Sequence, residues 1–267
     1  MNYEQKYLAL LEAIQTESME RNTRNAVTKS IFGAQLTIDE LMHNKFPILQ
    51  GRKIFYKGVV GELAAFLRGP KHIEDFTSQG CNYWNEWAEK DGSINVDYGN
   101  AWLDYNGVNQ LQSVVDSLRN DPYGRRHIIN AWRPDKLSEL SLPCCHYSYQ
   151  WYVDNSNHLH MVWIQRSVDT ILGLPSDVIL AAVLNLLMAR TTGYLPGRLT
   201  MQLGDTHIYS SHFAELDAYM SSAVAMAHSP KPSYWLSPVA TVFNFTPEMF
   251  DLTGYEHGPK LTFKLEK

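Results

Sequence analysis

Apolar residues recur at helical spacing along much of the chain. In residues 3–19, Tyr7, Leu11 and Ile14 fall on one side of a helix, which predicts an amphipathic helix at the start of the chain. Weaker patterns of the same kind predict helices over residues 55–67, 108–118 and 209–223. Residues 178–189 are apolar on nearly every face, so we expect this helix to be buried at the centre of the protein.

Strand patterns occupy the other regular stretches. Between His146 and Ile164, two runs rich in aromatic and β-branched residues flank the turn-forming residues 154–157, which predicts a β-hairpin. Further strands are predicted over residues 30–38, 127–132 and 198–203, with a turn at 121–124 and a basic, polar loop at 20–29. Because strands and helices do not alternate regularly, the chain is expected to have an α+β fold.

The composition is that of one folded unit. Hydrophobic residues make up 45% of the chain and charged residues 19%. This hydrophobic content is enough to form a packed core and argues against disorder. Residues 71–100 are rich in aromatics and turn formers and are expected to form a surface lobe. Since the sequence contains no repeat or linker, we expect a single domain spanning residues 1–267.

The overall charge excludes one class of function. A net charge of −5 and a pI near 6.0 argue against the broad basic face of a duplex-binding protein, so no direct DNA binding is expected. Any anionic ligand must therefore be bound by local arginines. The opening residues lack the pattern of a signal peptide, and no apolar run approaches the roughly 18 residues of a membrane span. We expect a cytoplasmic protein without membrane association.

The cysteines suggest a reactive thiol. Cys81, Cys144 and Cys145 are odd in number, and the adjacent pair fits neither a disulfide framework nor a zinc site. The segment 142–146 lies at the start of a predicted strand, and arginines occur in nearby loops. Cations lower the pKa of a thiol and populate the nucleophilic thiolate. By itself, however, a Cys-Cys-His string is more often inert packing than a catalytic centre.

Two other segments carry polar groups in suggestive positions. Residues 165–177 combine an arginine, a hydroxyl and two carboxylates. The alternative interpretation is structural, with Ser176 or Asp177 as the N-terminal cap of the following helix. In residues 204–212, His207 and Tyr209 are two apart on an extended segment and therefore point the same way, which suits a sugar hydroxyl. His212 adds a second histidine, but the spacing makes zinc improbable, and no metal is expected.

Together these segments resemble the thymidylate synthases over nearly the whole chain. The resemblance rests on residues 121–126, 142–146, 166–177 and 204–209, with further matches at 21–33, 61–63 and 84–88. It implies a mixed sheet packed by helices and a symmetric homodimer formed sheet to sheet. It also implies a pyrimidine deoxynucleoside monophosphate as substrate, and 5,10-methylenetetrahydrofolate as the co-substrate that supplies one carbon to C5 of the base.

The resemblance assigns roles residue by residue. Cys145 corresponds to the nucleophile that attacks C6, Glu62 to the residue that relays protons near the base, and Tyr98 to the tyrosine that assists proton removal at C5. The nucleotide-binding residues that it implies are Arg24, Arg166, Ser167, His207 and Tyr209, with Arg125 and Arg126 reaching the phosphate from the partner subunit. The folate-binding residues that it implies are Trp84, Trp87, Asp169, Leu172 and Gly173.

One departure concerns the base. Thymidylate synthases usually carry asparagine where this chain has Asp177, and the same aspartate distinguishes deoxycytidylate hydroxymethylases of bacteriophages. A carboxyl group can accept from N4 of cytosine and share a proton with N3, whereas an asparagine amide matches uracil. The sequence therefore favours deoxycytidylate, and a phage-encoded enzyme would work in the host cytoplasm.

The fate of the transferred carbon depends on water. Hydride from tetrahydrofolate gives a methyl group, and capture by water gives a hydroxymethyl group. Ser176 stands where the family has phenylalanine, and the chain ends among charges, which favours water; the retained Trp84 argues the other way. The rival hypotheses are a methyltransferase acting on deoxycytidylate or deoxyuridylate, and a catalytically inactive dimer that binds nucleotide or RNA as a regulator. The presence of the nucleophile Cys145 argues against an inactive protein.

Overall fold

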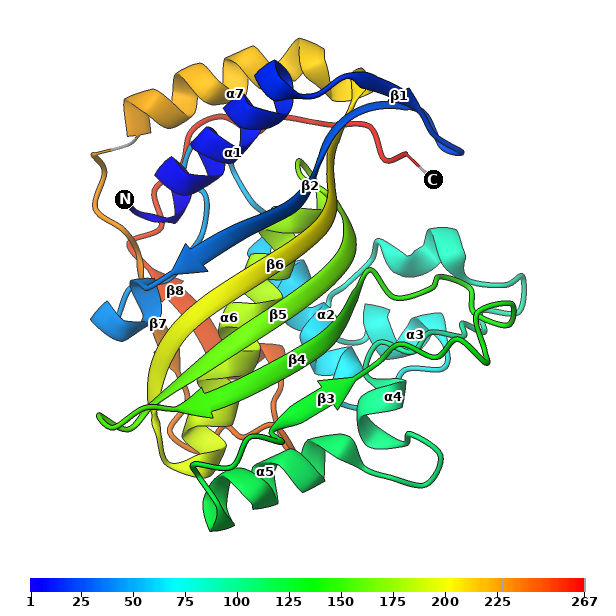
Figure 1. The fold of residues 1–267 in the computed structure, drawn as a ribbon, viewed down its shortest axis with the longest axis vertical. Coiled ribbons are helices and arrows are strands. Elements are labelled where there is room, and N and C mark those ends of the chain that lie inside the picture. The colour runs from blue at the N-terminus through cyan, green and yellow to red at the C-terminus, as the bar shows by residue number, and fades with distance from the viewer. Residues whose placement is uncertain (227, 267) are drawn as a thin grey trace.

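The computed structural model describes residues 1–226 and 228–266 and is built on a six-stranded sheet (Figure 1). The strand order is β1-β2-β6-β5-β4-β3, and all neighbours are antiparallel except the parallel pair β5 and β6. The strands of this sheet are β1 (Glu20–Asn22), β2 (Val27–Ile38), β3 (Ile128–Asn130), β4 (His146–Val153), β5 (His158–Asp169) and β6 (Leu195–Tyr209). A small second sheet pairs β7 (Ser233–Leu236) with β8 (Phe250–Thr253).

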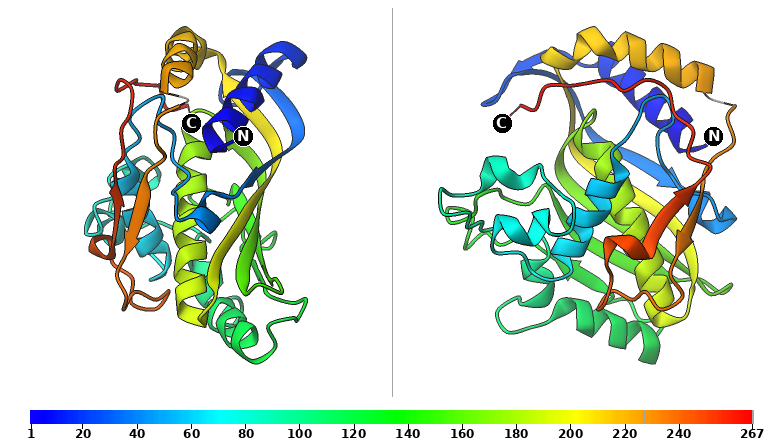
Figure 2. Two further views of the ribbon diagram at one scale, coloured as in Figure 1. Left: turned by 90° about the vertical axis from the view of Figure 1, so that its left-hand side faces the viewer. Right: turned by 180° about the vertical axis from the view of Figure 1, so that it is seen from behind.

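Helices cover one face of the large sheet, as Figure 2 shows, and leave most of the other face open. The α-helices are α1 (Tyr3–Glu17), α2 (Tyr56–Phe66), α3 (Ile73–Thr77), α4 (Asn100–Leu103), α5 (Gln110–Asn120), α6 (Gly173–Thr192) and α7 (Phe213–Met226). Short 3-10 helices are η1 (Glu40–His43), η2 (Trp84–Trp87), η3 (Ser210–His212) and η4 (Pro247–Met249). This arrangement confirms the α+β class, with a mixed sheet packed by helices.

The central helix α6 connects the parallel strands β5 and β6. Its residues are apolar on all sides, and it lies between the sheet and α2, as the layered view of Figure 2 shows. Gly173–Thr192 is long and apolar enough to cross a membrane by length and composition only. Because most of it is buried inside the fold, α6 is explained as a core helix.

Most of the sequence-predicted elements are confirmed, with two corrections. The predicted loop at 20–29 contains β1 and the start of β2, because three polar residues of β1 pair with Thr28 and its neighbours along the edge of the sheet. The predicted cap is also wrong. Helix α6 begins at Gly173, and neither Ser176 nor Asp177 caps it, since Leu172 occupies the N-cap position without a side-chain hydrogen bond.

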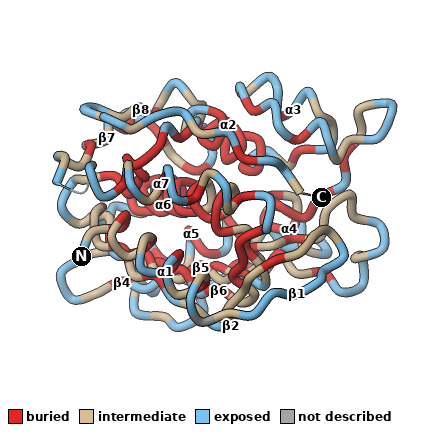
Figure 3. The backbone as a smooth tube through the Cα atoms, turned by 90° about the horizontal axis from the view of Figure 1, so that it is seen from above, coloured by how far each residue is buried: buried red, intermediate tan, exposed pale blue. Residues whose placement is uncertain are grey.

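The lobe at residues 71–100 packs its aromatic side chains inward. Phe66 of α2 stacks on Tyr98 with ring centroids 5.3 Å apart, and Phe76 stacks on Trp84 at 5.0 Å. Figure 3 shows the contrast in burial between α2, which is buried, and α3, which is mostly exposed. The lobe is thus at the surface as predicted, but its aromatic residues extend the core and fix the lobe to α2.

Candidate active site

The site lies at one end of the large sheet, where four strand ends meet. In register, His146 at the start of β4 pairs with Gln165, and Asp169 at the end of β5 pairs with His207. Thr28 at the start of β2 pairs with Tyr209. The three motif segments, which are distant in sequence, therefore converge at this end of the sheet.

Cys145 lies directly before β4 and is fixed by its backbone. Its N–H donates to the hydroxyl of Tyr98, and its carbonyl accepts from the N–H of Arg166 at 2.9 Å. The guanidinium of Arg166 lies 3.9 Å from the Cys145 sulfur and also donates to the Cys144 carbonyl at 2.8 Å. Cys144 is buried, whereas Cys145 is partly exposed. Of the adjacent pair, only Cys145 therefore presents an accessible thiol.

Two opposing effects set the pKa of the Cys145 thiol. Burial raises the pKa of Cys145, and the charge of Arg166 only partly opposes that rise. Arg166 lowers the thiol pKa, as expected of a nearby cation, but in the single chain the effect of burial is larger. His146 supplies no charge either, because burial lowers its pKa to about 3 and its Nδ1 lies 2.6 Å from the Tyr149 hydroxyl. Further arginines near the sulfur would lower its pKa and increase the population of the thiolate.

The remaining arginines are placed very differently from one another. Arg24 is exposed in the loop between β1 and β2, at the same end of the sheet as Cys145. Arg125 and Arg126 are also exposed, but they precede β3, whose start pairs with Gln150 towards the far end of β4. A single chain therefore brings Arg24 and Arg166 to the site, but not Arg125 and Arg126.

Glu62 on α2 is a buried carboxyl group held by two donors. The Tyr83 hydroxyl and the Trp84 indole N–H each donate to it at 2.6 Å. Burial raises the pKa of Glu62 to about 7, although both hydrogen bonds oppose the rise. Sequence reasoning missed Tyr83. It also treated Trp84 as a wall of the folate cleft, whereas this ring is buried and its N–H is occupied by Glu62.

Asp177 faces the sheet from the beginning of α6. Its Oδ2 accepts from the side-chain amide of Gln165 at 2.7 Å, a partner that the sequence analysis did not identify. Burial raises the pKa of Asp177 to about 8, and the charges of Glu62 and Asp169 add to the rise. At neutral pH Asp177 is therefore mainly a protonated acid, which offers one O–H donor as well as an acceptor.

The loop between β5 and α6 carries the predicted folate residues. Oδ1 of Asp169 accepts from the N–H groups of Ile171 at 2.8 Å and Leu172 at 3.3 Å, which shapes the turn into Gly173. Leu172 and Gly173 are partly exposed. Trp87 is also partly exposed, and its ring lies 5.4 Å from Trp84. Trp87 thus offers more accessible aromatic surface than Trp84.

His207 and Tyr209 lie side by side on β6, as the extended spacing predicted. Their ring centroids are 4.9 Å apart, and both side chains are largely buried. Nδ1 of His207 lies 3.0 Å from Asp205, a partner not singled out from the sequence. Asp205 in turn lies opposite Ser167 in the β5–β6 register and 3.3 Å from Arg21. The Asp205 contact fixes the orientation of the His207 ring.

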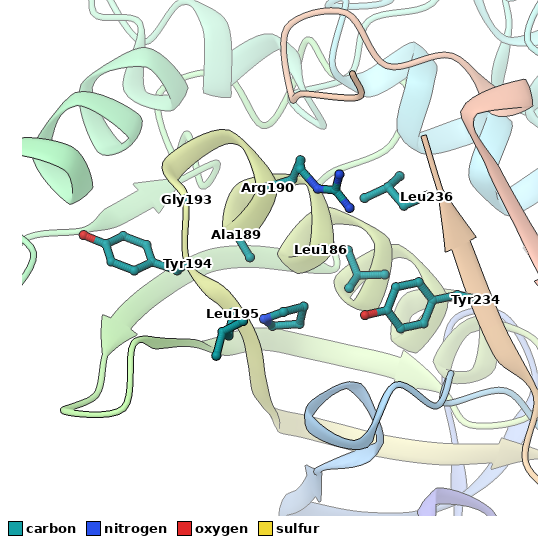
Figure 4. Close-up of a pocket in the computed structure, with 9 residues that line it drawn as sticks. Leu186, Ala189, Arg190, Gly193, Tyr194, Leu195, Tyr234 and Leu236 are labelled. Carbon is teal, nitrogen blue, oxygen red and sulfur yellow. The ribbon is translucent and has the colours of Figure 1, made fainter. Parts of the chain in front are cut away.

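Other features of the described residues do not compete with this site. Within residues 1–226 and 228–266, no three His, Cys, Asp or Glu residues are grouped so as to hold a metal. A cavity of about 320 Å³, drawn in Figure 4, lies at the opposite end of α6. It is lined by Leu186, Arg190, Tyr194 and Tyr234 among others and contains none of the predicted site residues.

The fold and this convergence of motifs define a folate-dependent one-carbon transferase. The thymidylate synthase family matches residues 5–266, and the chain belongs to that family. Members of this family use methylenetetrahydrofolate, bind a pyrimidine nucleotide and are usually dimers. A solved structure described as thermostable thymidylate synthase A from Bacillus subtilis is similar, with 29% identity and a TM-score of 0.88, and the match covers 100% of each chain.

Proposed function

We propose that this enzyme transfers the one-carbon unit of 5,10-methylenetetrahydrofolate to C5 of deoxycytidylate and releases 5-hydroxymethyl-deoxycytidylate. The observation that carries the choice of base is the Asp177 carboxyl group that accepts from the Gln165 amide at 2.7 Å; burial raises its pKa to about 8, which favours the protonated acid at neutral pH. With Oδ2 accepting from Gln165 and the proton on the other oxygen, the acid can donate to N3 of cytosine. An oxygen lone pair remains to accept from the N4 amino group.

The proposed chemistry begins with addition of the Cys145 thiolate to C6. The new S–C6 bond moves the electron pair of the 5,6 double bond to C5, while the proton from Asp177 neutralises charge that develops at N3. C5 then attacks the methylene carbon of the folate, whose bond to N10 breaks with protonation of that nitrogen, and C5 later loses its proton. Glu62, whose pKa of about 7 suits proton transfer at neutral pH, accepts and donates protons at the C4 side of the base.

The last step distinguishes the two products. Elimination of tetrahydrofolate leaves an exocyclic methylene at C5, and addition of water to that carbon, followed by loss of the cysteine, gives the hydroxymethyl group. Two features support this route. Ser176 places a hydroxyl beside the folate loop, donating to the Leu172 carbonyl at 3.2 Å, and Lys264 and Glu266 put charges near the end of the chain. The burial of Trp84 favours the alternative, reductive methylation to 5-methyl-deoxycytidylate.

Nucleotide binding in this proposal requires two chains. Arg24, Arg166 and Ser167 bind the 5′-phosphate from one chain, and His207 with Tyr209 binds the 3′-hydroxyl of the sugar. Arg125 and Arg126 complete the phosphate site from the partner, with the open sheet faces forming the homodimer. Asp169, Trp87, Leu172 and Gly173 bind the folate, with Trp84 behind them. Tyr98 assists removal of the C5 proton.

The test uses deoxycytidylate labelled with tritium at C5, together with methylenetetrahydrofolate. We expect tritium release and a product heavier by one hydroxymethyl group, measured by mass spectrometry, without a rise in dihydrofolate absorbance. Dihydrofolate formed in step with product would instead establish methylation. Parallel reactions with deoxyuridylate test the base, and faster turnover of that nucleotide would contradict the proposed substrate.

A further inference from the structure

A tyrosine at the surface of the lobe directs its hydroxyl inward to the buried Glu62. Tyr83 is 37% exposed, yet its hydroxyl donates to Oε2 of Glu62 at 2.6 Å. An exposed tyrosine ordinarily packs its apolar ring on the protein and leaves its polar tip in water. Here the arrangement is reversed, so the hydroxyl group is used on a carboxyl group inside the protein.

The backbone of α2 allows the lobe to come this close. A Cβ atom added at Gly61 would lie 2.1 Å from the carbonyl oxygen of Gln79 and 3.3 Å from the backbone nitrogen of Cys81. A side chain at Gly61 would therefore push residues 79–83 away from α2. Because Gly61 directly precedes Glu62, this contact sets the distance between the lobe and the carboxyl group.

The two donors to Glu62 are each held by a further contact. Trp84 donates its indole N–H to Oε1 at 2.6 Å and stacks on Phe76, with ring centroids 5.0 Å apart. The Tyr83 side chain also hydrogen-bonds to the thiol of Cys81. Each oxygen of the Glu62 carboxyl group thus has its own donor, and both donors favour the ionised form. The carboxyl group is thereby held in one orientation.

We propose that Tyr83 is a positioning residue that fixes the Glu62 carboxyl group and keeps part of it ionised at neutral pH, so that Glu62 can accept as well as donate a proton. The inference rests on the proposed function, in which Glu62 transfers protons at the C4 side of the base. Three titratable groups face Glu62, namely Tyr83 and Cys81 from the lobe and Asp177 from α6. Burial raises the pKa values of Tyr83 and Cys81 far above neutrality, so of these three only Asp177 titrates in the range of Glu62.

The hydrogen bond from Tyr83 opposes the effect of burial on Glu62. Burial raises the pKa of Glu62 to about 7, and of the two opposing hydrogen bonds the one from Tyr83 has the larger effect. A pKa of about 7 leaves roughly half of the carboxyl groups ionised at neutral pH. Loss of one hydrogen bond to a charged group raises a carboxyl pKa by about one pH unit, which would leave only about a tenth ionised.

The direct test is the titration of Glu62 in the full chain without substrate. It is followed by NMR of the carboxyl carbons of isotope-labelled glutamate, with Glu62→Gln to assign the signal. Tyr83→Phe keeps the ring, removes the hydroxyl and should raise the pKa of Glu62 by about one pH unit. Tyr56→Phe is the matched control, because Tyr56 lies on the same helix and its hydroxyl donates to Asp251 at 2.6 Å. The control should leave the pKa of Glu62 unchanged.

Gly61→Ala tests the close approach while the hydroxyl is still present. Residues 79–83 must move away from the added methyl group, so the pKa of Glu62 should rise as it does in Tyr83→Phe. Circular dichroism shows whether this variant is folded; if it is not, Tyr83→Phe and its control decide alone. An unmoved Glu62 titration in Tyr83→Phe, or an equal rise in Tyr56→Phe, overturns the assignment of Tyr83. An unmoved titration in folded Gly61→Ala contradicts the close approach as its cause.

Tritium release from C5 of deoxycytidylate connects the contact to catalysis. The ratio of wild-type to Tyr83→Phe turnover cancels the titrating groups that the two enzymes share and therefore isolates Glu62. We expect a ratio of about fivefold at pH 7 that falls within about twofold at pH 9, with the Kd for deoxycytidylate changed less than about twofold. A ratio that is the same at every pH overturns the role in proton transfer. If Tyr83→Phe moves the Glu62 titration but the wild-type enzyme releases no tritium, the proposed function fails while the contact stands.

Discussion

At the scale of single residues, the site contains two carboxyl groups whose pKa values are raised towards neutrality. Burial raises the pKa of Glu62 to about 7 and that of Asp177 to about 8, and the charge of Glu62 adds to the rise at Asp177. An ordinary exposed carboxyl group would have lost its proton about 3 to 4 pH units lower. In the proposed function these two groups donate protons where charge develops on the pyrimidine ring.

The proton on Asp177 leads to a pH prediction. In the proposed reaction Asp177 is protonated and Cys145 is ionised, so kcat/KM for deoxycytidylate should rise up to the Asp177 pKa of about 8 and then stay level, because loss of the acid offsets the gain of thiolate. In Asp177→Asn the rise should continue above pH 8, and preference should shift towards deoxyuridylate. Steady-state kinetics with both nucleotides from pH 6 to 10 provide the measurement. An unchanged ratio of specificity constants would remove the reason for choosing cytosine.

The adjacent cysteines allow a direct test of the nucleophile. Cys145→Ser should abolish tritium release from C5, because a serine hydroxyl does not ionise near neutral pH and cannot replace the thiolate. Cys144→Ser is the matched control, since that side chain is buried away from the accessible thiol, and it should retain most of the activity. Tritium release in a fixed time is measured for both. The opposite pattern would show that Cys144 is the nucleophile.

At the scale of elements, the parallel strands β5 and β6 hold the proposed phosphate- and sugar-binding residues in register. They approach closely at Gly204, where an added Cβ would lie 2.4 Å from the carbonyl oxygen of Arg166. A side chain at this position cannot fit unless the strands separate. The contact therefore requires glycine for a steric reason, although its φ is not in the left-handed region.

Gly204→Ala should therefore destabilise the protein and disturb Arg166. We expect a loss of about 1–3 kcal/mol in the free energy of unfolding, measured in denaturant, with a higher KM for the nucleotide. Gly173→Ala is the control, because its added Cβ would meet only ordinary contacts of 3.7 Å and longer at the start of α6. That variant should be neutral or slightly stabilising. Equal losses in the two variants would contradict the close-approach explanation.

At the scale of the whole molecule, one chain leaves its proposed phosphate site incomplete. Arg125 and Arg126 lie towards the end of β4 opposite to Cys145, and the uncovered sheet face offers the surface through which a second chain could supply them. A twofold interface is self-complementary, so each chain would lend and receive the same residues. Two shared sites per dimer follow from this symmetry.

Mixing two inactive variants tests this sharing. Cys145→Ser and Arg126→Ala chains, unfolded together and refolded, should regain about a quarter of wild-type activity, because random pairing makes half the dimers mixed, each with one intact site. Each variant refolded alone serves as the control. Activity that does not rise above the mean of the two separate variants would show that Arg126 acts within its own chain or plays no part.

The sequence predicted the fold class and most elements because their patterns are local. The hairpin of β4 and β5, the buried α6 and the opening helix α1 all follow from periodicity that neighbouring residues share. The prediction of a loop at residues 20–29 was wrong, because the polar residues of β1 form a strand only by pairing with β2. It also failed at the beginning of α6, whose start at Gly173 is set by Asp169 through the turn at Ile171.

What the sequence determined by itself is the kind of chemistry. The order of the motif segments, the thiol at position 145 and the carboxyl at position 177 are properties of residue identity, and they suffice to indicate the family. The tertiary structure decided the burial that raises the pKa values of Asp177 and Glu62, and the partners Gln165, Tyr83 and Asp205. These depend on burial and on contacts between residues far apart in the chain, which no local pattern encodes.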